Sequence, residues 1–579
     1  MVQSAKALLL ALLLLAARVG SHVAQDAGLS SKDGLVVCVS APACDVGAAV
    51  LARGGNAVDG AVATSFALAV THPSAGNIGG GGFMIVRTPS GDLTSFDYRE
   101  KAPLKSTRTM YLGEDGKIDR GLTAAGYLAP GVPGSVHGLE RAHRKFGTLP
   151  WKDVVMPAVM LAEQGFTVSA ALARGLNREV QGPMKRFPAS VAAYGKPGGD
   201  EWAEGDRIVL SDLGKTLRAI AEGGADAFYK GPIADLIAAD MEANGGIISK
   251  EDLAAYEAKE RVPVKGTYRG YEIVSMPPPS SGGVALIEML NILEQFDLES
   301  KGQHSAEALH LEIEAMRRAY LDRARHLGDP DFVDVPVARL TSKEYARTLA
   351  AGIDPKKATS SIELGRDIVT DPAAEPAETT HFSVIDRNGM AVTSTTTLEG
   401  GYGSHVVVKG AGFLLNNEMG DFNRKPGDTS TGGDIGTPAN LIDPGKRMLS
   451  SMTPTMVLRD GQVVLLTGSP GGRTIINTVL AVVLGVTEFG LDGRQAVDAA
   501  RMHHQWLPDT VRIEEGGVTR EVLAALKAMG HNVTVQGRQG DAHTIWVDSD
   551  GTSHGVNDRR SADSKASRVR GLTSSALAR

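Results

Sequence analysis

The pattern of polar and hydrophobic positions changes abruptly at residue 379. Residues 371–377 contain two prolines and two acidic residues, a composition typical of an exposed loop without regular structure. Residues 381–385 and 391–398 are β-rich runs joined by a turn at 386–389, which predicts a hairpin. The pattern therefore places Thr379 where a loop meets the first strand of a hairpin.

Helical and extended patterns divide the rest of the chain. Between residues 130 and 350, apolar residues recur mainly at helical spacing, with a stiff proline-rich loop at 276–283. The helices expected in this part are 150–164, 211–223, 234–244, 284–296 and 305–327. Before it we expect a strand at 34–39, helices at 45–53 and 57–70, and a hairpin of strands at 83–88 and 93–98. After the first hairpin we expect strands at 413–415, 455–459 and 463–467, and an apolar helix at 474–489.

Cleavage of the bond between Glu378 and Thr379 would give Thr379 an unusual chemistry. Its new α-amine would stand beside its own hydroxyl, and an α-amino group has a pKa of about 8. The neutral amine could then act as the base for a hydroxyl that is otherwise a poor nucleophile. The alternative is that Thr379 and Thr380 are ordinary residues at the start of a strand, since threonine favours strands.

Composition and charge exclude several classes of protein. The chain has 579 residues, of which 42% are hydrophobic and 22% charged, as expected for a globular protein with a large core. Its net charge of −7 gives no support for a nucleic-acid partner. No apolar stretch of about 18 residues follows the N-terminus, so we expect no membrane span in the body of the protein.

The N-terminus has the pattern of a signal peptide. Lys6 precedes an apolar run at 7–17, and small residues follow as far as Ala24. The run is short for a membrane span, although an uncleaved anchor is the alternative. We expect a signal peptide at 1–24 and export to the periplasm or the extracellular space. The Ala- and Gly-rich composition favours a bacterial periplasm.

The two cysteines, Cys38 and Cys44, leave two alternatives open. In an exported protein they could pair and close a small loop, or they could remain as two buried thiols. Two cysteines without a histidine cluster do not make a metal site, so we expect no metal. The glycine run 79–82 lacks the Lys-Ser/Thr of a phosphate-binding loop, which indicates tight packing and no nucleotide cofactor.

Two further places in the sequence suggest groups that could bind a negatively charged part of a substrate. Gly471 and Gly472 open the apolar helix at 474–489, where backbone N–H groups could stabilise an oxyanion. Arg99 ends a predicted strand, a place where a guanidinium can bind a carboxylate in a bidentate fork. The alternatives are an ordinary helix-start turn and an ordinary surface charge.

Taken together, twelve segments resemble the γ-glutamyltranspeptidase family of N-terminal-nucleophile hydrolases. They occur in family order from about residue 34 to 562, and their order makes the resemblance specific although each segment alone is weak. The segments are 54–59, 76–84, 97–100, 132–134, 276–283, 314–320, 328–332, 379–381, 416–422, 450–452, 468–472 and 503–506.

The resemblance implies that the precursor cuts itself between Glu378 and Thr379. It implies a large subunit at 25–378 and a small catalytic subunit at 379–579, which stay together as a heterodimer. The fold that it implies is α+β: a four-layer αββα sandwich formed jointly by both subunits. No metal or organic cofactor is implied.

The resemblance also implies a role for each site residue. Thr379 would be the nucleophile, Thr397 would orient it, and the amides of Gly471 and Gly472 would hold the oxyanion. The α-carboxylate of a glutamyl group would be bound by Arg99, Ser450 and Ser451. Its α-ammonium would be bound by Glu418 and Asp421.

Two positions depart from the family pattern. Glu399 stands where many members carry an asparagine that helps to bind the amino group. In the loop 423–449, Gly432 stands where well-known members place an aromatic residue that closes over that asparagine. A third acid could still hold an α-ammonium, so the departures bear on lid closure and on the balance between hydrolysis and transfer.

The leading hypothesis is an exported enzyme that hydrolyses glutathione and other γ-glutamyl compounds or transfers their γ-glutamyl group to amino acids or peptides. The first alternative is a related cephalosporin (glutaryl) acylase, which shares the self-cleaving residue but uses another donor. The second is a non-catalytic exported binding protein on the same scaffold.

Overall fold

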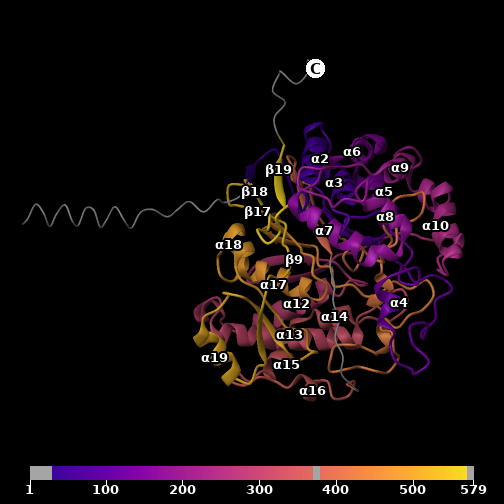
Figure 1. The fold of residues 1–579 in the computed structure, drawn as a ribbon. Helices are drawn as coiled ribbons and strands as arrows, with labels where there is room; N and C mark the ends of the chain where they lie inside the picture. Colours follow the sequence, from indigo (N-terminus) through magenta and orange to yellow (C-terminus); the bar gives the residue numbers. More distant parts are fainter. Residues whose placement is uncertain (1–28, 370–378, 570–579) are drawn as a thin grey trace, which may run out of the picture.

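Two stacked β-sheets form the centre of the protein, and helices cover both outer faces (Figure 1). The computed structural model describes residues 29–369 and 379–569. The predicted signal peptide, the loop 371–377 and Glu378 lie outside the described residues. No helix in the described part of the chain combines the length and apolar character needed to cross a membrane.

The first sheet carries the hairpin that follows residue 379. Its order is β19 (Lys565–Arg568), β2 (Gly34–Cys38), β10 (Thr380–Asp386), β11 (Ala391–Thr397), β3 (Gly81–Arg87), β4 (Leu93–Asp97) and β7 (Lys259–Arg261). All neighbours in it are antiparallel. Strands from before and after residue 379 are neighbours at three places in it, β19 with β2, β2 with β10 and β11 with β3, so cleavage there would leave two chains hydrogen-bonded within one sheet.

The second sheet is also antiparallel and also mixes the two parts of the chain. Its order is β1 (Leu29–Ser31), β18 (Ser553–Val556), β17 (Thr544–Val547), β13 (Gln462–Thr467), β12 (Thr455–Arg459), β9 (Tyr271–Ser275) and β8 (Val264–Tyr268). A small third sheet contains β14 (Met502–His503), β15 (Val511–Glu514) and β16 (Val533–Gln536).

Three apolar cores separate four layers. Because side chains alternate along a strand, Val36 of β2 packs toward the outer helices while Leu35 and Val37 pack between the sheets. Met456 of the second sheet belongs to the same inter-sheet core. The sequence of layers is helix, sheet, sheet and helix, which confirms the α+β four-layer sandwich.

The outer helices form two groups on opposite sides of the sheets (Figure 1). One group contains α2 (Ala41–Ala52), α3 (Ala57–Thr71), α5 (Ser135–Phe146), α6 (Trp151–Gln164) and α9 (Ser211–Tyr229). The other contains α12 (Gly282–Leu293), α13 (Ala306–His326) and α17 (Thr474–Thr487). The remaining α-helices of the described residues are α4 (Arg120–Ala124), α7 (Ala170–Gln181), α8 (Pro188–Tyr194), α10 (Pro232–Ala243), α11 (Lys250–Ala254), α14 (Val337–Leu340), α15 (Lys343–Ala351), α16 (Ser361–Leu364), α18 (Gly493–Asp498) and α19 (Arg520–Ala528).

Most of the predicted elements are present, with shifts of a few residues at their ends. The strand predicted at 413–415 is wrong, because only Leu414 makes an isolated bridge, to Val407. The pair β8 and β9 lies inside the segment that we predicted to be mainly helical. Both strands are short, and β8 alternates buried with exposed residues at the edge of its sheet.

Cys38 and Cys44 form a disulfide, which decides between the two alternatives for these residues. Cys38 ends β2 and Cys44 lies in the first turns of α2, with a Cα–Cα distance of 5.8 Å. The bond therefore ties the first sheet to the helix that covers it.

We expect the buried Glu312 on α13 to make the free energy of unfolding depend on pH. It faces a small apolar cavity beside Leu309 and Met316, and burial raises its pKa from about 4.5 to about 8. Between these values the folded state holds a proton that the unfolded state lacks, so the free energy of unfolding falls as pH rises. Glu312→Gln should remove this decline, raising the melting temperature at pH 8 and changing it little at pH 4.

The matched control is Glu307→Gln, because Glu307 is exposed near the start of the same helix. The difference in melting temperature between wild type and Glu312→Gln should grow between pH 4.5 and 8 and then stay constant. A difference independent of pH would contradict a buried, protonated Glu312.

Candidate active site

Thr379 and Thr397 face each other at the ends of β10 and β11. The antiparallel register pairs Thr380 with Thr396, and one step further along the hairpin brings Thr379 opposite Thr397. The two hydroxyl oxygens are 3.3 Å apart, and both residues are buried. The Thr397 hydroxyl also accepts the backbone N–H of Glu399 at 2.7 Å. Thr397 can therefore donate its own hydrogen toward Thr379.

The glycine run holds this end of β11 in place by close packing. A Cβ on Gly80 would lie 2.1 Å from the Thr397 carbonyl oxygen, so no larger residue fits without movement. Asn77 donates to the same carbonyl oxygen at 2.8 Å and to the Thr396 hydroxyl at 3.1 Å. The interpretation of the run as a tight-packing segment is confirmed.

Gly471 and Gly472 form the turn between β13 and α17. Both have positive φ angles, 127° and 54°, which favour glycine. Their carbonyl oxygens accept backbone hydrogen bonds from the first turn of α17, whereas neither N–H donates to any described residue. Two backbone donors are therefore available at this turn, as an oxyanion hole requires.

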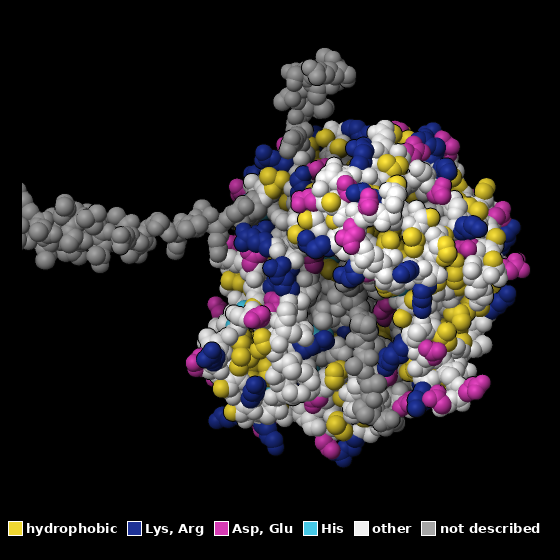
Figure 2. Space-filling model, in the orientation of Figure 1, with side chains coloured by type: hydrophobic (Ala, Val, Ile, Leu, Met, Phe, Trp, Pro, Cys, Tyr) yellow, Lys and Arg dark blue, Asp and Glu magenta, His cyan; other side chains and the backbone are white. Residues whose placement is uncertain are grey.

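A cavity of about 430 Å³ joins the nucleophile candidate to this turn. Thr379 and Gly471 both line it, together with polar side chains from the small third sheet. This volume lies in the range of pockets that bind small molecules. The space-filling view shows a hollow in one face of the protein with Lys and Arg side chains around it (Figure 2).

Arg99 is the centre of a buried charge cluster. Its guanidinium pairs with Glu418 at 2.6 Å, with Glu100 at 3.5 Å and with Asp421. It also donates to the carbonyl oxygens of Met448 at 3.2 Å and of Leu449 at 3.3 Å. The Arg99 side chain is 1% exposed whereas that of Asp421 is 37% exposed, so Asp421 covers the guanidinium.

Carboxyl groups outnumber cations in this cluster. Burial raises the pKa of Glu418 well above its usual range, while Arg99 opposes that rise and Glu100, Asp421 and Glu399 reinforce it. Burial by itself would lower the pKa of Arg99, and the carboxylates raise it above its usual value. A further cation bound here would favour the ionised form of these carboxyl groups.

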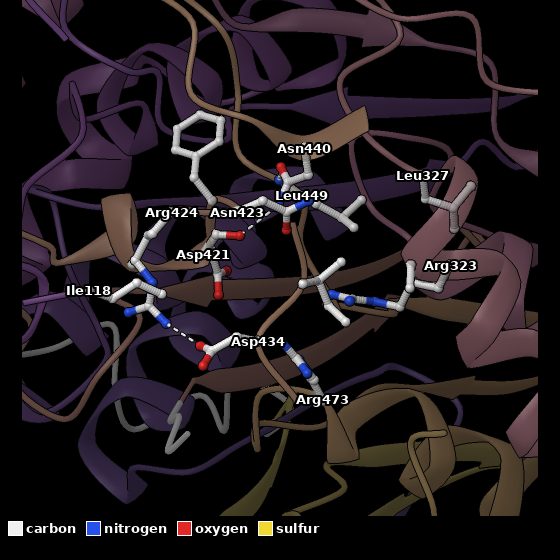
Figure 3. Close-up of a pocket in the computed structure, with 14 residues that line it drawn as sticks. Ile118, Arg323, Leu327, Asp421, Asn423, Arg424, Asp434, Asn440, Leu449 and Arg473 are labelled. Atoms are coloured by element: carbon white, nitrogen blue, oxygen red, sulfur yellow. Dashed lines mark hydrogen bonds and ion pairs between the residues drawn. The ribbon is translucent and has the colours of Figure 1, made fainter. Parts of the chain in front are cut away.

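The cluster opens on a small cavity of about 20 Å³ (Figure 3). Asp421, Asp434 and Arg473 line it. Asn440 donates from its side chain to the backbone oxygen of Asp421 at 2.7 Å. Asp421 is thus held by its backbone at the edge of the cavity while its carboxylate reaches Arg99.

Ser450 and Ser451 lie beside Arg99 because residues 448 and 449 contact the guanidinium directly. The Ser450 hydroxyl accepts the backbone N–H of Met452 at 3.1 Å, and the Ser451 hydroxyl accepts from Arg323 at 3.1 Å. Sequence reasoning missed Arg323 and Glu100. No local pattern marks Arg323, which comes from α13 in the outer helical layer.

The two positions that depart from the family pattern lie close to this site. Glu399 has φ of 76°, a left-handed conformation in which asparagine is common and glutamate is not. Gly432 lies in the turn 430–434, where Asp434 pairs with Arg120 at 2.6 Å. Arg473, which follows the turn of Gly471 and Gly472, donates to the carbonyl oxygen of Gly433 at 2.9 Å. The loop 423–449 therefore contacts the site through the Gly433 carbonyl oxygen and the Asp434 carboxylate.

Within the described ranges, His310, Glu314 and His531 form the one group with spacing suitable for a metal ion. The His310 ring nitrogens lie 2.7 Å from His531 and 2.7 Å from the carbonyl oxygen of Asp354. Glu314 pairs with Arg317 and Arg318 at 3.3 and 2.6 Å. Glu314 thus already has two cationic partners on its own helix, α13.

The sequence matches known proteins over most of its length. The family model described as gamma-glutamyltranspeptidase matches residues 43–567. The chain belongs to the γ-glutamyltranspeptidase family. A relative in Escherichia coli strain K12, named glutathione hydrolase proenzyme, is 47% identical over 533 residues, covering 92% of this chain and 91% of its own.

Solved structures of γ-glutamyltranspeptidase family members and their relatives share this fold. The Helicobacter pylori γ-glutamyltranspeptidase is 47% identical, with a TM-score of 0.54, and covers 55% of this chain and 91% of its own. A cephalosporin acylase from Bacillus halodurans is 27% identical, with a TM-score of 0.82, and covers 94% of this chain and 97% of its own. The acylase likeness shows that the fold alone does not select the donor.

Proposed function

We propose that this protein is a self-cleaving γ-glutamyltransferase and glutathione hydrolase. The observation that carries the proposal is the pairing of Thr379 with Thr397 at 3.3 Å in a chain of the γ-glutamyltranspeptidase family. The N–H groups of Gly471 and Gly472, which donate to no described residue, support it, because Gly471 lines the same cavity as Thr379.

The first reaction is cleavage of the precursor between Glu378 and Thr379. The Thr379 hydroxyl attacks the carbonyl carbon of Glu378, the C–N bond breaks, and the nitrogen takes the hydroxyl proton to become the α-amine of Thr379. Water then hydrolyses the resulting ester and releases the carboxylate of Glu378. The products are a large subunit ending at Glu378 and a small subunit starting at Thr379, held together by the shared sheets.

Turnover repeats the same chemistry on a γ-glutamyl amide. The Thr379 hydroxyl attacks the γ-carbonyl, its proton passes through the α-amine to the leaving nitrogen, and a γ-glutamyl ester forms. Gly471 and Gly472 stabilise the oxyanion and Thr397 orients the nucleophile. Water or the amino group of an acceptor then breaks the ester and restores the Thr379 hydroxyl.

The charge cluster around Arg99 binds the glutamyl head group. A substrate carboxylate takes the place of Asp421 on the Arg99 guanidinium, with the hydroxyls of Ser450 and Ser451 as further donors. The displaced Asp421, with Glu418 and Glu399, faces the α-ammonium. The excess of carboxylates over cations in this cluster supports that assignment.

A comparison of two anilides tests the donor. Wild-type protein should hydrolyse γ-glutamyl-p-nitroanilide at least about 100-fold faster, in kcat/KM, than glutaryl-p-nitroanilide. Glutaryl lacks the α-ammonium and so leaves the buried carboxylates without a cation. Equal or faster glutaryl turnover would favour the acylase. Hydrolysis of neither anilide by the cleaved protein would favour a binding protein.

The donors, the acceptors and the cellular location of the protein also belong to the proposal. The donors are glutathione and other γ-glutamyl compounds, and the acceptors are amino acids or short peptides. Export and removal of residues 1–24 are predicted from the sequence pattern, as is the preference for a bacterial periplasm.

A further inference from the structure

The small third sheet forms one wall of the cavity that contains Thr379. Arg512 lies in its middle strand β15, Gln505 follows β14, and Arg538 and Gln539 follow β16. All four side chains line the same cavity as Thr379. The nucleophile and this polar wall therefore belong to one binding space.

The wall is positively charged. Among the described residues that line the cavity, Arg473, Arg512 and Arg538 are cationic and only Asp541 is acidic. Asp541 is partly buried and its carboxylate lies 3.2 Å from the ring of the buried His543. The cavity thus favours an anionic ligand near this wall.

Arg512 is half-buried and has no carboxylate partner among residues 29–369 and 379–569. Its guanidinium donates to the side-chain oxygen of Gln505 at 3.2 Å. Burial lowers the pKa of Arg512, Tyr320 opposes this, and Arg473 lowers it further. Partly buried arginines are commonly paired with an anion, so this guanidinium can bind an anionic group of a ligand in the cavity.

The charge cluster around Arg99 and the wall formed by the small third sheet lie at adjoining cavities, because Arg473 lines both cavities. Asp421 lines the first cavity and Thr379 the second. If the glutamyl head group displaces Asp421 from Arg99 at the edge of the first cavity, the second cavity receives the group attached to the amide nitrogen. The leaving amine and the attacking amine occupy the same place, because transfer is the reverse of acylation.

We propose that Arg512 is a specificity-determining residue that binds the carboxylate of the amino acid or peptide leaving from, or attacking, the γ-glutamyl ester of Thr379. This inference rests on the proposed function and adds the class of ligand at the second half of the site: an amine that also carries a carboxylate. Arg473 and Arg538 strengthen the positive field around it.

The first test uses wild-type protein and two acceptors. With γ-glutamyl-p-nitroanilide as donor, glycylglycine should be used with a kcat/KM about 10- to 100-fold above that of glycylglycinamide, which has no carboxylate. Equal use of the two acceptors would overturn the inference. This measurement does not depend on the folding of any variant.

The second test compares donors in Arg512→Gln. The ratio of kcat/KM for glutathione to that for γ-glutamyl-p-nitroanilide should fall about 10-fold or more, because only glutathione has a carboxylate on its leaving group. Arg512→Lys should restore part of the ratio. Arg459→Gln is the matched control, since Arg459 is an exposed residue of β12 outside the cavity, and should keep the wild-type ratio.

The outcomes separate the inference from the proposed function. An unchanged ratio in Arg512→Gln, with active wild-type protein, would overturn the role of Arg512 and leave the γ-glutamyl chemistry intact. Wild-type protein that is cleaved at Thr379 but hydrolyses neither donor would overturn the proposed function itself.

Discussion

Replacing Thr379 by alanine is expected to leave one uncut chain without measurable γ-glutamyl hydrolysis. Alanine lacks the hydroxyl that attacks the Glu378 carbonyl, so neither self-cleavage nor acylation can begin. The Thr379 hydroxyl lies 3.3 Å from that of Thr397, and no other predicted site residue offers an N-terminal nucleophile after cleavage at this bond. Intact mass spectrometry and N-terminal sequencing would measure cleavage, and γ-glutamyl-p-nitroanilide would measure turnover.

Thr379→Ser is the matched control, because serine keeps the hydroxyl and removes only a methyl group. It should still yield two chains, the smaller one starting at residue 379, and retain part of the activity. Thr380→Ala tests the neighbouring threonine, whose side chain is on the opposite face of β10. Maturation of Thr379→Ala into two chains would show that Thr379 is not the residue that cuts the precursor.

Replacing Arg99 by methionine is expected to have the largest effect among the substrate-binding residues. The change leaves Glu418 and Glu100 buried without their cation, and removing one partner from a buried charge pair typically costs about 3–5 kcal/mol. The free energy of unfolding should fall by that amount at neutral pH and by less at low pH, where the carboxyls can take protons. Binding of a glutamyl carboxylate should weaken at the same time.

Arg99→Lys separates the two effects. Lysine keeps a positive charge among the carboxylates, so stability should recover in part, but its ammonium cannot form a bidentate fork with a carboxylate. We expect KM for a γ-glutamyl donor to stay at least about 10-fold above wild type in this variant. Arg108→Met is the control for stability, since Arg108 forms an ion pair with Asp443 at the surface.

If Arg99→Met unfolded at the same denaturant concentration as wild type, the cluster would not depend on this guanidinium. If Arg99→Lys bound donors as well as wild type, bidentate recognition at Arg99 would be wrong. The second result would mean that the glutamyl carboxylate binds to another part of the site.

The sequence by itself determined the local structure around the nucleophile. Proline-rich composition before residue 379 and β-rich alternation after it predicted the hairpin of β10 and β11, and the structure contains it. The ordered family segments predicted the four-layer fold, which the strand and helix patterns alone did not select. The wrong strand at 413–415 and the missed strands β8 and β9 were short, and short apolar runs do not distinguish these states.

The tertiary structure decided which distant residues meet. Asp421 reaches Arg99 across 322 positions of sequence, and Arg323 reaches Ser451 from a helix of the outer layer. Arg512 lines the cavity of Thr379 although it belongs to a separate small sheet. Periodicity and turn chemistry act over a few residues, whereas these contacts arise from the packing of layers, so charge pairing and cavity walls were settled only when the two sheets and their helices came together.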